Sequence, residues 1–163
     1  QNGQLIRISR GLYALPERKS SEYTAFVELS KVHPQLTYCL LSALHFHKLS
    51  SQLPHEIWIA IPNKGYAPVS EHWSLRVVRF SGDALTEGVE EHCLEGVTIR
   101  VTSVAKTVSD CFKYRNKIGL DVALEALNDA WRNQRVSIDE LWHYAGVCRI
   151  RNVIRPYLES ITL

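Results

Sequence analysis

One short segment in the middle of the chain is apolar on both faces of an extended strand. Residues 55–61 lie between two prolines, with three isoleucines on one face and Trp58 and Ala60 on the other. A strand that is hydrophobic on both faces is stable when other elements cover both sides of its sheet. The chain is therefore expected to build a layered domain around a buried sheet.

The segments on either side supply the expected layers. The chain has 163 residues, which is enough for one compact core. Helical spacing is predicted before this strand and throughout the last third of the chain, where Pro156 is expected to kink the final helix or delay its start. The predicted helices cover 22–32, 37–49, the segment after Ser103, 121–132, the segment after Ser137, and the C-terminal segment; further strands are predicted over 74–80, 88–93 and 97–101, with a short helix or turn near 82–86. This order favours an α/β (α+β) fold, with a small central mixed β-sheet flanked by helices and a C-terminal helical bundle.

The N-terminal residues predict a β-hairpin. Residues 4–8 and 12–15 alternate in the manner of strands, and Ser9-Arg10-Gly11 between them provides a turn. Arg7 and Arg10 belong to this ribbon or its tip. Two interpretations stay open: a wing that contacts DNA phosphates, or a solvated hairpin with ordinary surface arginines.

The densest polar group surrounds the start of a predicted helix. Thr102 or Ser103 is a candidate cap, and Lys106 and Asp110 are spaced i, i+4, so they share a helix face. One hypothesis places Lys106 at a phosphate, which would suit a nuclease or phosphotransferase. The other is a capped helix carrying a surface or half-buried ion pair.

Five arginines in the C-terminal helices form the strongest basic cluster of the sequence. They could contact nucleic acid or an acidic partner, or they could be solvated helix faces interspersed with acidic residues. The cluster comprises Arg132, Arg135, Arg149, Arg151 and Arg155.

The remaining patterns argue against several classes of protein. The net charge of +2 is too small to indicate nucleic-acid binding by itself. The sequence contains no C-x-x-C pair, no H-E-x-x-H and no phosphate-binding or dinucleotide fingerprint, so we expect no metal and no cofactor. Four widely spaced cysteines are typical of reduced structural thiols and of a cytoplasmic protein. No apolar run reaches the length of a membrane span, and no membrane association is expected.

A long run in the last third resembles a known family. Residues 101–130 read VTSVAKTVSDCFKYRNKIGLDVALEALNDA, which is similar to the most characteristic segment of AbiEi-type antitoxins and transcriptional regulators. Shorter stretches agree with it over nearly the whole chain. These are RGLY at 10–13, CLLSAL at 39–44, QLP at 52–54 with IWIA at 57–60, and RPYLE at 155–159. At Lys48 the chain departs from the family pattern, which has a small residue there, often glycine.

The resemblance implies a domain organisation and a function. Residues 1–16 would be the wing of a winged-helix DNA-binding domain, with Arg7 and Arg10 in the wing, and residues 17–163 the C-terminal antitoxin domain. The chain has no methionine, and we expect a fragment whose preceding winged-helix segments are missing. The full-length protein would repress its own operon by binding operator DNA, and the C-terminal domain would counteract a nucleotidyltransferase-like toxin without catalysis.

Two other functions stay open at this point. The first is an enzyme, nuclease-like or phosphotransferase-like, that uses Lys106 and Asp110. The second is an interaction module that oligomerises through the C-terminal helices. A metal-dependent nuclease would need clustered carboxylates, and Asp110 is the only obvious one near Lys106.

Overall fold

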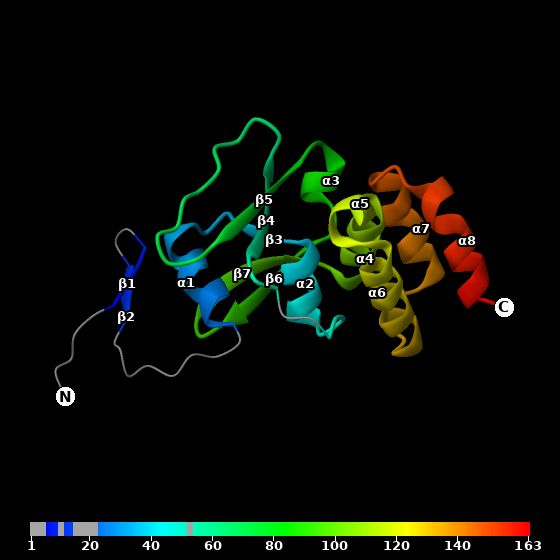
Figure 1. Cartoon of the computed structure of the whole chain (residues 1–163), viewed down its shortest axis with the longest axis horizontal. Helices are drawn as coiled ribbons and strands as arrows, with labels where there is room; N and C mark the ends of the chain where they lie inside the picture. Colours follow the sequence, from blue (N-terminus) through cyan, green and yellow to red (C-terminus); the bar gives the residue numbers. More distant parts are fainter. Residues whose placement is uncertain (1–5, 10–11, 15–22, 52–53) are drawn as a thin grey trace.

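A computed structural model describes residues 6–9, 12–14, 23–51 and 54–163. Eight helices and seven strands lie within these ranges (Figure 1). In chain order they are β1 (Ile6–Ser9), β2 (Leu12–Ala14), α1 (Thr24–Val32), β3 (Thr37–Tyr38), α2 (Leu40–His47), β4 (Ile57–Pro62), β5 (Leu75–Phe80), α3 (Asp83–Thr86), β6 (Val89–Leu94), β7 (Val97–Thr102), α4 (Val104–Lys113), α5 (Arg115–Ile118), α6 (Leu120–Arg132), α7 (Ile138–Val147) and α8 (Arg151–Ile161).

The central sheet is mixed, which confirms the predicted fold class. Its strand order is β5-β4-β3-β7-β6, with β4 parallel to β5, β3 parallel to β7, and antiparallel pairing between β3 and β4 and between β6 and β7. The N-terminal hairpin is also present, because β1 pairs with β2 in antiparallel register. The predicted turn residues Arg10 and Gly11 lie outside the described residues.

The two faces of β4 are covered by different layers, as the sequence predicts. Ile59 and Ile61 pack into a cluster with residues of α1, while Trp58 and Ala60 pack into a second cluster with α4 and the C-terminal helices. Figure 1 shows α1 on one side of the sheet and α4, α6, α7 and α8 gathered on the other. Burial on both sides accounts for the apolar character of both faces of this strand.

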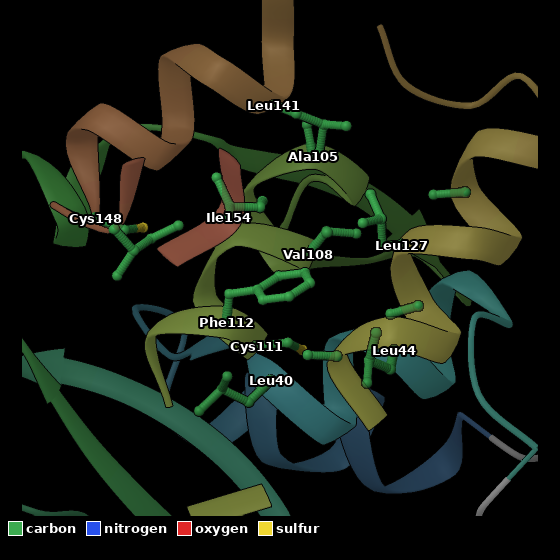
Figure 2. Close-up of a cluster of buried hydrophobic side chains, with 14 of the residues drawn as sticks. Leu40, Leu44, Ala105, Val108, Cys111, Phe112, Leu127, Leu141, Cys148 and Ile154 are labelled. Atoms are coloured by element: carbon green, nitrogen blue, oxygen red, sulfur yellow. The ribbon is translucent and has the colours of Figure 1, made fainter. Parts of the chain in front are cut away.

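Helix α4 lies at the centre of the larger cluster. Figure 2 shows Val108, Cys111 and Phe112 of this helix among side chains of α2, α6, α7 and α8. Eight of its ten residues are buried, including four polar ones. The polar members of this buried set are Lys106, Thr107, Ser109 and Asp110.

One predicted helix start is wrong, and one of the two effects predicted for Pro156 is excluded. Residues 37–38 do not begin a helix; they form β3, which is hydrogen-bonded between β4 and β7. The helix predicted after Ser103 ends at Lys113, and Arg115 opens the short helix α5. The excluded effect of Pro156 is a delayed start, because α8 begins five residues earlier, at Arg151; the predicted kink stays a prediction. Pro156 is exposed, so the carbonyl that loses its helical partner can be hydrated.

Two predicted helix starts are confirmed. The Ser103 side chain accepts a hydrogen bond from the Lys106 backbone N–H at the start of α4. Ser137 and Glu140 form a reciprocal capping box at the start of α7. Such caps satisfy backbone donors that the first helical turn leaves without partners.

Among the described helices, none has both the length and the apolar character that crossing a membrane requires. All four cysteines are free thiols; three are buried and Cys93 is exposed.

Candidate functional site

Lys106 and Asp110 form a buried ion pair in the middle of α4. The Lys106 Nζ donates to both carboxylate oxygens of Asp110, at 2.7 and 2.9 Å. The two side chains are 0% and 2% exposed. The predicted i, i+4 pairing is therefore confirmed, but the pair lies in the core rather than at the surface.

The surroundings of Lys106 leave its ammonium group little freedom. Its Nζ lies 4.7 Å from the centre of the Phe80 ring, and its side-chain stem runs against Gly88. Gly88 has a φ of 78°, and a Cβ at this position would lie 2.7 Å from the Cβ of Lys106. Glycine is required there both by backbone conformation and by the close approach of the lysine. These contacts are those of a structural cation.

The Asp110 carboxylate also accepts a hydrogen bond from the thiol of Cys148, which donates to Oδ1 at 3.3 Å. Burial raises the pKa of Asp110 above its ordinary value, and the attraction of Lys106 opposes that rise. Burial also raises the pKa of Cys148, with a further contribution from the Asp110 charge. Cys148 is therefore a neutral thiol at physiological pH, suited to donating a hydrogen bond rather than acting as a nucleophile.

Asp110 is also one of the residues that line a cavity of about 360 Å³. Its walls come from the end of β5, α3, the last turn of α4 and the turn between α7 and α8. Three cationic residues, Arg79, Lys113 and Arg149, line it from three separate segments. We call this hollow the basic cavity.

An aromatic pair forms another wall of the basic cavity. The rings of Phe80 and Tyr114 are stacked, with centroids 5.7 Å apart and planes 15° from parallel. Burial, with a smaller contribution from the Asp110 charge, raises the pKa of Tyr114 to about 12. The Tyr114 hydroxyl therefore remains protonated at neutral pH, and the cavity combines cationic donors with an aromatic surface.

The structure divides the predicted C-terminal arginine cluster. Arg151 and Arg155 both stack on the Trp142 ring, 4.9 and 5.1 Å from its centre, and Arg151 donates to the Trp142 carbonyl. A shallow pocket beside Gly146 is lined by both Arg149 and Arg151. These three arginines therefore follow one edge of the α7–α8 helical pair, and we call them, with Trp142, the basic edge.

The other two arginines of the cluster lie elsewhere. Arg135 donates to the carbonyl of His47, so it fastens the end of α2 to the segment after α6. Arg132 is the last residue of α6 and lines a different surface pocket with Trp131 and Val136. The continuous basic patch predicted from the sequence is thus reduced to its last three members.

The N-terminal candidates stay predictions. Arg7 lies in β1 opposite Tyr13, and Arg10 lies outside the described residues.

Sequence reasoning missed Arg79, Lys113 and Trp142. Arg79 lies in an alternating strand, and Lys113 lies near the end of a helix, where a basic residue is common. Neither pattern distinguishes these residues from ordinary surface positions. They become candidates because the fold brings β5, α4 and the α7–α8 turn together.

No protein-family model and no curated protein matches this chain. No group of three or more His, Cys, Asp or Glu side chains within the described ranges could hold a metal ion. The candidate sites are therefore the basic cavity and the basic edge, defined by their own geometry.

Proposed function

We propose that this chain is the antitoxin domain of an AbiEi-type protein, a cytoplasmic regulator of a type IV toxin–antitoxin operon concerned with phage defence. In this proposal the domain binds or counteracts a nucleotidyltransferase-like toxin and catalyses no reaction. Operator DNA would be bound by the winged-helix domain of the full-length protein, with Arg7 and Arg10 in its wing.

The observation that carries the proposal is the role of residues 101–130, the segment that resembles the family. This segment contains α4, α5 and α6, and α4 is the most deeply buried of them although four of its buried residues are polar. Lys106 and Asp110 neutralise each other inside the domain. Residues used in this way specify a scaffold, which supports a binding function more than catalysis.

The basic edge is the surface best suited to contact a partner. Arg151 and Arg155 are exposed, and within the described part of the chain neither forms an ion pair with a carboxylate. Tryptophan and arginine, which are in contact here, are typical of the residues that dominate the energetics of protein interfaces. An acidic surface of the toxin is the partner that this chemistry fits.

The test is neutralisation of the nucleotidyltransferase-like protein encoded beside this gene. The double variant Arg151→Glu/Arg155→Glu should lose growth rescue on co-expression, while the control Arg132→Glu should keep it. The melting temperature of each purified variant establishes that the fold is retained. Full growth rescue by a folded double variant would show that the basic edge is not needed for neutralisation. A neighbouring gene of unrelated type would contradict the antitoxin function itself.

The enzymatic alternative has its own test. We expect neither hydrolysis of nucleic acid nor phosphoryl transfer by the purified protein, with or without divalent metal ions. An activity that a folded Lys106→Met variant loses would establish the enzyme instead.

A further inference from the structure

The basic cavity has more cationic donors than its own residues use. Arg79, Lys113 and Arg149 line the cavity together with two acidic residues, Asp83 and Asp110. The charge of Asp110 is already neutralised by Lys106 at 2.7 Å. Within the described part of the chain, none of the three cations forms an ion pair. The local field in the cavity is therefore positive, although the whole chain carries a net charge of only +2.

Arg79 and Lys113 are held in place by backbone carbonyls rather than by carboxylates. One guanidinium nitrogen of Arg79 donates to the carbonyls of Pro62, Asn63 and Gly65, at 3.4, 3.1 and 2.7 Å. Lys113 donates to the Cys148 carbonyl at 3.0 Å. These contacts restrain the two side chains without a carboxylate partner and leave most of their N–H groups available.

Arg149 completes the set from the turn between α7 and α8. It ends the α7 turn with a φ of 59°, a left-handed conformation unusual for a residue other than glycine. Its backbone N–H donates to Gly146, and the next N–H returns to Ala145, so the backbone that carries the side chain is fixed. Among the described residues, none forms a hydrogen bond or ion pair with the Arg149 side chain, whose five donors are therefore free.

We propose that the basic cavity binds a phosphoryl group, either as free phosphate or as a small phosphate monoester. Three cations from three segments supply the donors that a tetrahedral oxyanion needs, since its oxygens accept several charge-assisted hydrogen bonds at once. The volume of about 360 Å³ fits a small molecule. Tyr114 offers the organic part of a monoester an aromatic surface. This site does not rest on the antitoxin proposal.

The experiment is calorimetric titration of the full chain in 150 mM NaCl with inorganic phosphate, adenosine monophosphate and adenosine. We expect binding that depends on the phosphoryl group and no binding of adenosine. Binding of both phosphates identifies a monoester site, and binding of phosphate without the nucleotide identifies a free-phosphate site. Failure of both phosphates to bind, or equal binding of adenosine, would overturn the proposal.

Matched variants locate the binding. Arg149→Gln should weaken phosphate binding by about threefold to tenfold, because one exposed charge-assisted contact is lost. Lys113→Gln should act in the same direction, and the control Arg132→Gln should leave the affinity unchanged. Equal affinities in all three folded variants would place the phosphate elsewhere and refute the site. A 12-nucleotide DNA that binds when phosphate and the nucleotide do not would replace the proposal by a nucleic-acid surface.

Discussion

Replacing Lys106 by methionine tests whether the ion pair of α4 is a buried structural element. The substitution keeps most of the apolar stem against Gly88 and removes the charge that holds Asp110. The carboxyl group of Asp110 then has the Cys148 thiol as its one remaining side-chain partner among the described residues. A buried charge that loses its partner typically destabilises a protein by about 3–5 kcal/mol.

Protonation of Asp110 sets an upper limit on the free-energy cost of its unpaired charge. Asp110 can take up a proton instead of staying charged, and its ordinary pKa is 3.8. Protonating such a group at pH 7 costs about 4.4 kcal/mol, since each pH unit corresponds to about 1.36 kcal/mol. We therefore expect Lys106→Met to lower the free energy of unfolding by about 3–4 kcal/mol at pH 7.

The pH dependence separates this explanation from simple loss of packing. In the variant, the pKa of Asp110 is higher in the folded state than in the unfolded state. The contribution of Asp110 to the free energy of unfolding is therefore fully present below the unfolded-state pKa and is lost as the pH rises through the folded-state pKa. The difference from the wild type should narrow as the pH falls from 7 to 5, by up to about 1.36 kcal/mol per pH unit.

Urea unfolding followed by circular dichroism at pH 5, 6 and 7 measures the effect. The control Lys31→Met, at an exposed position of α1, should change stability by less than about 0.5 kcal/mol at every pH. The double variant Lys106→Met/Asp110→Asn should lose less free energy of unfolding than the two single variants lose in sum. A penalty for Lys106→Met that stays constant or grows as the pH falls would refute the reasoning.

Two further predictions concern helix α2. Lys48 ends this helix in the left-handed region, with φ 59° and ψ 42°. Lys48→Gly should therefore raise the free energy of unfolding by about 1 kcal/mol, while the control Lys31→Gly within α1 should lower it by a similar amount. A lower free energy of unfolding in Lys48→Gly would contradict this prediction. Burial lowers the pKa of His47 below 6.5, so its contribution to stability is fully present above pH 6.5 and is lost as the pH falls through the folded-state pKa. The folded variant His47→Gln should therefore lose less stability than the wild type between pH 6.5 and 5 in urea unfolding, and an identical acid dependence would show that His47 does not titrate in this range.

Much of the fold could be predicted because local patterns identify most of its elements. The two-faced apolar strand, the caps at Ser103 and Ser137, and the i, i+4 spacing of Lys106 and Asp110 are all present in the structure. Each of these patterns involves residues that are close together in the chain, so their spacing alone predicts it.

The failures arose where distant segments compete with local preference. Thr37 and Tyr38 form β3 because their backbones hydrogen-bond to β4 and β7. Helix α2 ends at Lys48, although this residue carries a long side chain and adopts a left-handed conformation. The return hydrogen bond from Leu49 to Leu44 and the complete burial of Leu49 accompany this backbone conformation.

The sequence by itself determined the α/β class, the order of most helices and strands, and the pairing of Lys106 with Asp110. Only the tertiary structure decided that this pair is buried, that the arginine cluster divides, and that Arg79, Lys113 and Arg149 meet around one cavity. The physical reason is the range of the interactions. Periodicity and capping act between near neighbours in the chain, whereas burial and the electrostatic field at a site depend on segments that only folding brings together.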